Sequence, residues 1–251
     1  MPSNERLKAI LPSSTRRWLR DRRLPFERLQ RRLGIGPSLL RRTAPINAND
    51  YGESRGQCID RYYIEEFLAA QAAHVRGHVL EFSDDTYARK FGGTKVTKVD
   101  VLHLTAGNPH ATIVADLGSG ENILSDTFDC ILCTQVLHCI FEVRAAVRTL
   151  YRILKPGGVV LVTDAGIQKV DPVDLANEEE YWRFTSLALR RLFEEVFPKD
   201  QVEVKTFGNV LAAVAFLHGL AVEDLREKDL DLRDPDYEVS IALRAVKPKT
   251  S

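Results

Sequence analysis

The chain has 251 residues and no net charge, and 44% of its side chains are apolar, which suffices for one substantial hydrophobic core. Its longest apolar run, Val210–Leu217, is far shorter than the roughly 20 residues that a membrane-spanning helix needs. Three of the four cysteines cluster at Cys130, Cys133 and Cys139, but no further cysteine or histidine pair completes a zinc framework. We therefore expect no metal site, and buried free thiols in a reducing cytoplasm.

The charge is divided unevenly along the chain. Residues 1–42 contain twelve basic and three acidic side chains, a net charge of +9, and the remainder therefore carries −9. Pro25 interrupts any single helix in this segment, and a cluster of glycine and proline at residues 34–37 ends its second half. We interpret residues 1–57 as a basic N-terminal helical arm and residues 58–251 as the main domain. The charge of the arm favours an anionic surface as its partner.

Beyond the arm, the apolar pattern predicts helices that alternate with strands. Residues 59–75 have apolar side chains at three- and four-residue spacing, which is typical of a helix. The pattern then predicts, in chain order, a strand at 78–82, a short helix at 86–91, strands at 95–100, 112–115 and 128–134, a helix at 141–154, a strand at 159–163, a helix at 185–197, a strand at 202–206, a helix at 209–220 and a strand at 239–246. This alternation indicates an α/β fold with a mostly parallel sheet and helices on both faces.

Short motifs fall at the ends of these strands. They are Val79–Glu81, Asp100, Ala115–Leu117, Phe128–Ile131, Val136–His138 and Leu154–Gly158. Their order and spacing resemble the class I S-adenosylmethionine-dependent methyltransferases, in particular the type 11 group with its quinone- and sugar-modifying enzymes. The resemblance covers about residues 77–166. It implies a Rossmann-like sheet of seven strands and S-adenosylmethionine as cofactor.

In such folds the ligand lies beyond the carboxyl ends of the strands, where the strand order reverses. Glu81, Asp100 and Asp116 are the acidic candidates for cofactor binding. A carboxylate at Asp100 can accept the hydroxyls of a ribose, and the resemblance implies a contact from Asp116 to the adenine amino group. Ser83 and Asp84, in the loop after the first strand, complete this candidate set. Capping of loops and helix ends by the aspartates is the alternative interpretation.

That loop departs from the family pattern. The family has approximately Glu-x-Gly-x-Gly-x-Gly, whereas residues 81–87 read Glu-Phe-Ser-Asp-Asp-Thr-Tyr. Because glycine lets the backbone approach a ligand closely, its absence predicts a narrower or differently shaped pocket. Asp84 and Asp85 would repel the pyrophosphate of NAD or FAD, whereas S-adenosylmethionine carries a sulfonium and an ammonium instead. The sequence therefore disfavours a dinucleotide cofactor.

Two segments are candidates for the acceptor site. An aromatic cluster of Tyr181, Trp182 and Phe184 lies between the fifth strand and the next helix, a connection that often lines the acceptor pocket in the resembled fold. Ordinary packing of these rings under a loop is the alternative. Residues 207–236 separate the last two strands, where the simplest members of the fold have a hairpin. This segment either covers the edge of the sheet or shapes the acceptor site.

His138 is the candidate catalytic residue, because it follows the fourth strand close to the expected methyl group. Methyl transfer from sulfur is an in-line displacement, so the enzyme aligns donor and acceptor and in some cases deprotonates the acceptor. An imidazole at this position can accept a proton from a hydroxyl group. The alternative is that His138 is only a loop residue near the site.

These observations favour methyl transfer from S-adenosylmethionine to a small-molecule or carbohydrate-like acceptor such as a glycan. The first rival is a methyltransferase-like binding or scaffold protein that has lost the cofactor, which the missing glycines favour. A nucleic-acid methyltransferase ranks third and is disfavoured. Residues 134–137 read Thr-Gln-Val-Leu, without the Asn/Asp-Pro-Pro-aromatic element with which amino-methylating enzymes act on bases.

If the basic arm acts by charge alone, deleting residues 1–42 leaves the melting temperature of the domain nearly unchanged. Binding to anionic vesicles is then lost with the arm, and salt weakens it in the intact chain, because salt screens exposed charges. A thermal melt and a vesicle sedimentation assay measure the two effects. A large loss of thermal stability on deletion would instead show that the arm belongs to the core.

Overall fold

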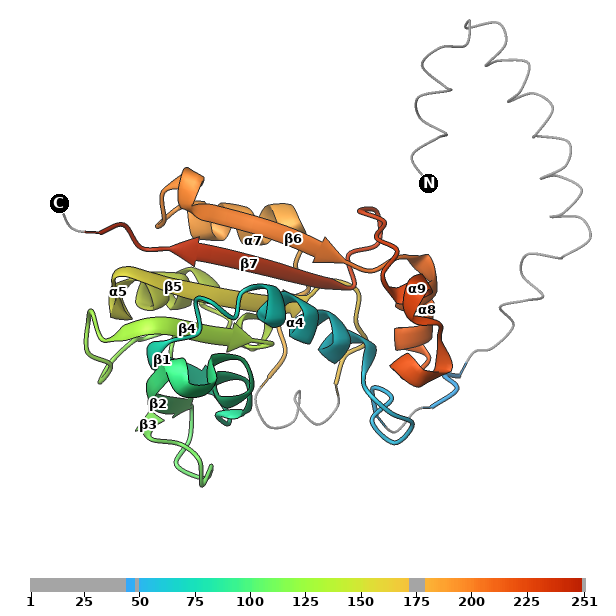
Figure 1. Cartoon of the computed structure of the whole chain (residues 1–251), viewed down its shortest axis with the longest axis horizontal. Helices are drawn as coiled ribbons and strands as arrows, with labels where there is room; N and C mark the ends of the chain where they lie inside the picture. Colours follow the sequence, from blue (N-terminus) through green and yellow to red (C-terminus); the bar gives the residue numbers. More distant parts are fainter. Residues whose placement is uncertain (1–43, 48–49, 172–178, 250–251) are drawn as a thin grey trace, which may run out of the picture. The chain divides into compact units, whose positions relative to one another are not determined.

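The computed structural model describes residues 44–47, 50–171 and 179–249. The described chain from Ile46 onward forms one compact unit (Figure 1). Residues 1–43, most of the predicted arm, lie outside the described residues, so the arm and the domain boundary at residue 57 stay predictions. In the described ranges no helix has both the length and the apolar character needed to cross a bilayer.

A seven-stranded, mostly parallel sheet forms the centre of the described structure, as the sequence predicts. Its strands are β1 (Gly77–Phe82), β2 (Val96–His103), β3 (Ile113–Val114), β4 (Phe128–Thr134), β5 (Leu154–Ala165), β6 (Val202–Phe207) and β7 (Ser240–Val246). They lie in the order β3-β2-β1-β4-β5-β7-β6, and β7 runs antiparallel to both of its neighbours. The strand order therefore reverses between β1 and β4, where such sheets bind their ligands.

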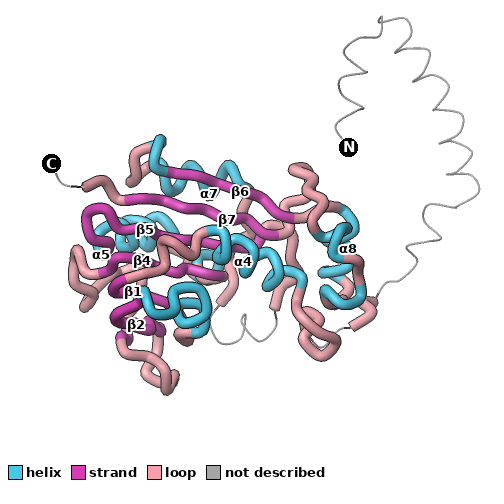
Figure 2. Tube along the Cα trace, in the orientation of Figure 1, coloured by secondary structure: helices cyan, strands magenta, loops and turns pink. Residues whose placement is uncertain are grey.

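Helices cover both faces of this sheet (Figures 1 and 2). One face packs against α5 (Val143–Ile153) and α7 (Ser186–Glu194), and the other against α4 (Ile59–Ala70), α8 (Val210–Leu217) and α9 (Glu227–Leu230). Successive side chains of a strand point to opposite faces. Accordingly, β4 sends Ile131 and Cys133 into the first core, and Cys130 and Leu132 into the second. This explains why the sequence of β4 is apolar throughout.

The difference from the predicted boundaries that matters most for the site is in β2. The sequence predicts a strand that ends at Asp100, but β2 continues to His103, and Val101 and Leu102 in this extension are buried. The predicted boundary is wrong because a carboxylate is rare inside a buried parallel strand, and Asp100 is therefore expected to be the last residue of the strand. The first helix is also shorter than predicted, since α4 ends at Ala70.

The segment between β6 and β7 folds onto the face of the sheet that α4 covers. Phe216 of α8 and Leu230 of α9 belong to the same core cluster as Tyr63 and Phe67 of α4. The hydroxyl of Tyr63 donates a hydrogen bond of 3.0 Å to the carbonyl of Leu230. No described residue of this segment lines the cavity considered below, so the segment supports the fold instead of shaping that cavity.

The side chain of Asn209 joins the start of α8 to the end of the segment, and it is 4% exposed. Its Oδ1 accepts a hydrogen bond of 3.0 Å from the Ala212 amide and caps α8, while its Nδ2 donates bonds of 2.7 Å to the carbonyls of Asp229 and Leu232. We expect Asn209→Ala to lower the free energy of unfolding by about 2–3 kcal/mol, because it removes a helix cap and the two hydrogen bonds that the buried amide donates to the carbonyls of Asp229 and Leu232.

Urea denaturation measures this loss, and Thr185→Ala is the matched control. Thr185 also caps a helix, α7, by accepting a hydrogen bond of 3.2 Å from the Ala188 amide, but its side chain is exposed and makes no buried bond to another segment. We expect about 1 kcal/mol for the control. Equal losses in the two variants would contradict a bridging role of Asn209.

Candidate functional site

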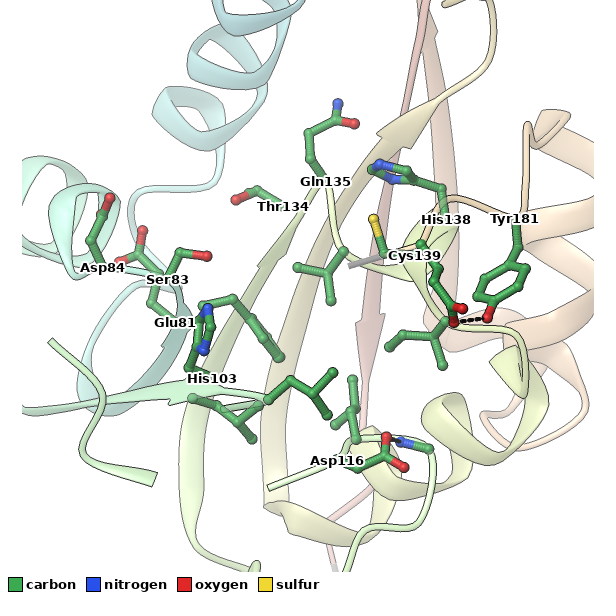
Figure 3. Close-up of a pocket in the computed structure, with 18 of the residues that line it drawn as sticks. Glu81, Ser83, Asp84, His103, Asp116, Thr134, Gln135, His138, Cys139 and Tyr181 are labelled. Carbon is green, nitrogen blue, oxygen red and sulfur yellow. Dashed lines mark hydrogen bonds between the residues drawn. The ribbon is translucent and has the colours of Figure 1, made fainter. Parts of the chain in front are cut away.

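A cavity of about 1210 Å³ opens at the carboxyl ends of the central strands. Its walls come from the loop after β1, the end of β2, the segment after β3, the turn after β4 and the start of α4. Figure 3 shows Glu81, Ser83 and Asp84 on one side of this cavity and His138 and Tyr181 on the other. The cavity therefore lies at the reversal of strand order, where the sequence predicts the cofactor.

Glu81, at the end of β1, holds the loop that follows it. The side chain is 2% exposed, and its two oxygens accept hydrogen bonds of 3.0 and 2.7 Å from the amides of Tyr87 and Ala88. Burial raises the pKa of Glu81 to about 7, although these two amide bonds favour the ionised form. Glu81 lines the cavity, but both of its oxygens are already engaged by the loop.

Ser83 takes a backbone conformation that glycine adopts far more readily than other residues. Its φ angle is 67°, in the left-handed region, at the position of the first glycine of the family loop. Its carbonyl accepts a hydrogen bond of 2.7 Å from Asn108 Nδ2. Asp84 Oδ1 accepts one of 2.8 Å from the Thr86 amide, so Asp84 caps the turn as the alternative interpretation had it. Both residues line the cavity, and the loop keeps its left-handed turn without glycine.

Asp100 does not lie where the sequence predicts. It sits inside β2, three residues before the strand ends at His103, and it is not among the residues that line the cavity. It accepts hydrogen bonds from Lys98 Nζ at 2.8 Å and Thr112 Oγ1 at 2.9 Å, and lies 2.6 Å from His78 Nε2. Burial opposes its ionisation, but these contacts outweigh it and lower its pKa. Asp100 therefore belongs to a structural ion-pair cluster, and we withdraw the ribose contact predicted for it.

Asp116 follows β3 and lines the cavity as predicted. Its Oδ1 accepts a hydrogen bond of 2.7 Å from the Gly118 amide, which orients the carboxylate within a turn.

His103 lies at the carboxyl end of β2, where an acidic residue was expected from the sequence. Its Nδ1 lies 3.0–3.3 Å from atoms of Thr105. Of the three acids predicted at strand ends, the structure thus brings Glu81 and Asp116 to the cavity.

His138 lies in the short turn after β4 and is 2% exposed. Its Nδ1 is 2.7 Å from Asp164 Oδ1, and its Nε2 is 3.9 Å from Glu180 Oε1. Burial alone would lower the pKa of His138, but the hydrogen bonds to Asp164 and Cys139 outweigh it and raise the pKa to about 10. This environment favours the imidazolium, which cannot accept a proton, and it therefore disfavours the predicted role of general base.

Two residues of the site, Asp164 and Gln135, were not predicted from the sequence. Asp164 is fully buried at the end of β5, and a lone carboxylate that closes a buried strand is the signal that could have found it. Gln135 follows β4 with a φ angle of 55°, lines the cavity, and has a buried Oε1 without a hydrogen-bond partner among the described residues. Ser83, Gln135 and Glu179, three of the five described non-glycine residues with positive φ, line this one cavity. Such strain concentrates at functional sites.

The predicted aromatic cluster is divided in the structure. Tyr181 lines the cavity, Phe184 is buried in the core, and Trp182 stacks on Phe141, with 6.0 Å between ring centroids and 22° between ring planes. Tyr181 thus agrees with the interpretation that this segment lines the pocket, and Phe184 with the alternative of ordinary packing. The amides of Tyr181 and Trp182 donate hydrogen bonds of 2.8 and 3.1 Å to the carbonyl of His138. The buried imidazole is therefore connected to the cavity wall through its own backbone.

Comparison with known proteins agrees with this architecture. Residues 63–160 match the family model described as a methyltransferase domain. The N-methyltransferase NodS from Bradyrhizobium japonicum, solved with S-adenosyl-L-homocysteine, is 12% identical, with a TM-score of 0.50 over 82% of this chain and 95% of that one. The YcgJ protein from Bacillus subtilis is 15% identical, with a TM-score of 0.45 over 74% and 100%. The cyclase SpnF is 16% identical, with a TM-score of 0.49 over 83% and 88%.

No curated protein sequence matches the chain. The strand order, the cavity at its reversal and the likeness to NodS define a Rossmann-like methyltransferase fold. The motifs that carry the resemblance to the class I S-adenosylmethionine-dependent methyltransferases all lie within the residues that match the methyltransferase domain.

The buried imidazolium gives stability a definite dependence on pH. The pKa of His138 rises from 6.5 to about 10 on folding, so the native state binds the proton more tightly and this contribution is lost as the pH rises through that window. Between about pH 7 and about pH 8.5 we expect the wild type to lose on the order of 1–2 kcal/mol more than His138→Gln, and the ionisation of the cysteines cancels because both proteins contain them. Urea unfolding at both pH values measures the difference. Parallel losses in the two proteins would argue for a neutral His138.

Proposed function

We propose that this protein transfers a methyl group from S-adenosylmethionine to a small-molecule or carbohydrate-like acceptor. The observation that carries the proposal is the cavity at the reversal of strand order, bounded by the left-handed loop at Ser83 and by Asp116. A cytoplasmic location agrees with the four free cysteines, three of which are buried. Asp116 and the backbone of residues 82–84 would hold the cofactor.

The charge of the cavity walls supports this choice of cofactor. The described lining includes carboxylates at Glu53, Asp60, Glu65, Glu81, Asp84, Asp116, Glu142 and Glu179, against basic groups at Arg61, His103 and His138. Such an excess of carboxylates attracts a cation and repels phosphate. S-adenosylmethionine supplies a methyl group on a positively charged sulfur and carries no phosphate. The walls therefore fit this cofactor better than a dinucleotide.

Alignment of donor and acceptor is the main chemical task of this site. The environment of His138 favours its protonated form, and both oxygens of Glu81 hold loop amides, so both side chains are poorly suited to remove a proton from the acceptor. An in-line displacement gains its rate from orientation, and a walled cavity at fixed strand ends provides that orientation. We therefore favour an acceptor atom that is nucleophilic without a dedicated general base.

A methyltransferase-like scaffold without cofactor is the alternative, and a specific observation favours it. The end of β2 carries His103 in place of an acid, and Tyr87 occupies the position of the third glycine in the family loop. The Tyr87 side chain lines the cavity, where a glycine would leave space. Nucleic acid stays a disfavoured substrate, and an anionic surface remains the expected partner of the basic arm.

Calorimetric titration with S-adenosylmethionine at low salt tests the proposal. We expect binding, and we expect Asp116→Asn to weaken it about tenfold because a charge-assisted contact is lost. Asp100→Asn is the matched control, since it removes the same charge outside the cavity and should leave the affinity nearly unchanged. The sulfonium donor should bind at least as tightly as S-adenosylhomocysteine, whose sulfur is neutral.

Two outcomes would contradict the proposal. If millimolar S-adenosylmethionine gives neither heat nor a thermal shift, the scaffold interpretation is the better one. If Asp100→Asn weakens binding and Asp116→Asn does not, the cofactor lies elsewhere than in this cavity. Clearly tighter binding of S-adenosylhomocysteine would count against attraction by the acidic walls.

A further inference from the structure

Three aromatic rings lie at the cavity with unusually large exposed areas. Phe141 is 60% exposed, Tyr181 41% and Trp182 36%. Phe141 contacts both of the others, with ring centroids 5.2 Å from Tyr181 and 6.0 Å from Trp182. Phe141 and Tyr181 themselves line the cavity. We call these three residues the aromatic rim.

Hydrogen bonds fix the backbone and one ring of the rim. The amides of Tyr181 and Trp182 both bond to the carbonyl of His138, whose ring is paired with buried Asp164. The indole Nε1 of Trp182 donates a hydrogen bond of 2.9 Å to the carbonyl of Ile140. The backbone of residues 181–182 and the indole of Trp182 are therefore held in position, while all three rings stay partly exposed to solvent. Exposed aromatic surface that is both clustered and held in place marks a binding surface.

The surroundings of the rim restrict the charge of what it can bind. Glu142 follows Phe141 directly and lines the cavity, and Glu179, which also lines it, bonds to the hydroxyl of Tyr181. Two carboxylates beside an apolar surface disfavour an anionic ligand. The rim is continuous with the cavity through Ile140 and Cys139, so a molecule on the rim would reach the region beyond β4.

We propose that the aromatic rim is the acceptor-binding surface, and that it takes the flat apolar face of a ring without negative charge. An aromatic ring and a sugar ring both offer such a face, so the rim defines the shape and charge of the acceptor. This inference rests on the proposed methyltransferase function, for which it specifies the acceptor. Phe141 is the central residue, since it contacts both other rings and has the largest exposed fraction of the three.

Ligand-observed NMR on the full chain saturated with S-adenosylhomocysteine tests the proposal. The probes are 2-naphthol for an aromatic ring, methyl β-glucoside for a sugar ring and 2-naphthoate for an anionic ring. We expect 2-naphthol or methyl β-glucoside to bind, and the one that binds identifies the kind of ring. We expect 2-naphthoate to bind more weakly than 2-naphthol, because of Glu142 and Glu179.

Phe141→Ala should weaken binding of the accepted probe about tenfold, since an aromatic contact is lost. Leu187→Ala is the matched control, because Leu187 is 62% exposed on α7 and does not line the cavity. S-adenosylhomocysteine affinity should be unchanged in both variants, which verifies that they fold. Absence of binding by both uncharged probes at millimolar concentration, or equal binding by wild type and Phe141→Ala, would overturn the proposal.

The two proposals fail in different ways. If the wild type does not bind S-adenosylhomocysteine, the proposed function fails, and titration of the probes into the unliganded protein still tests the rim. If S-adenosylhomocysteine binds and the probes do not distinguish Phe141→Ala from Leu187→Ala, only the rim proposal fails.

Discussion

The contact between His138 and Asp164 is the interaction on which the cavity depends. It joins the turn after β4 to the end of β5, and both side chains are buried, at 2% and 0% exposed. Asp164 Oδ1 also accepts a hydrogen bond from the Ala165 amide, and the carbonyl of His138 holds the backbone of residues 181–182. Loss of either partner would leave an uncompensated buried charge, which is strongly destabilising. One ion pair thus fixes the cavity wall that carries the rim.

The opposite wall of the cavity is formed by the loop after β1. This loop makes a left-handed turn without glycine, because hydrogen bonds from other residues stabilise it. A left-handed backbone at Ser83 is strained, and such strain persists only where neighbours determine the conformation. Glu81 supplies two hydrogen bonds to loop amides, and Asn108 supplies one to the Ser83 carbonyl. The absence of glycine therefore does not by itself indicate a collapsed site. What differs from the family is Tyr87, whose side chain lines the cavity at a glycine position.

The sequence predicts the fold well because the buried strands are continuous apolar runs between helices of clear period. It predicts the site less well, because partners far apart in the chain decide it. Asp100 is engaged by His78 and Thr112, which lie on either side of it in sequence and meet it only once the strands pair. In the same way, no local sequence pattern around His138 predicts its contact with Asp164, which lies 26 residues further along the chain. A motif gives the residue type, but its protonation state and direction come from the tertiary contacts.

These two corrections change how the cavity discriminates among ligands. With Asp100 committed to Lys98 and His78, recognition of a ribose hydroxyl by a carboxylate at the end of β2 is not available in this structure. With His138 paired to Asp164 in an environment that favours its protonated form, proton removal from an acceptor by the turn after β4 is disfavoured. What remains is the acidic lining and the aromatic rim, which act on charge and on shape. Because electrostatic attraction acts over several ångströms and stacking only at contact, the proposed function assigns selection of a cationic donor to the walls and orientation of a flat acceptor to the rim.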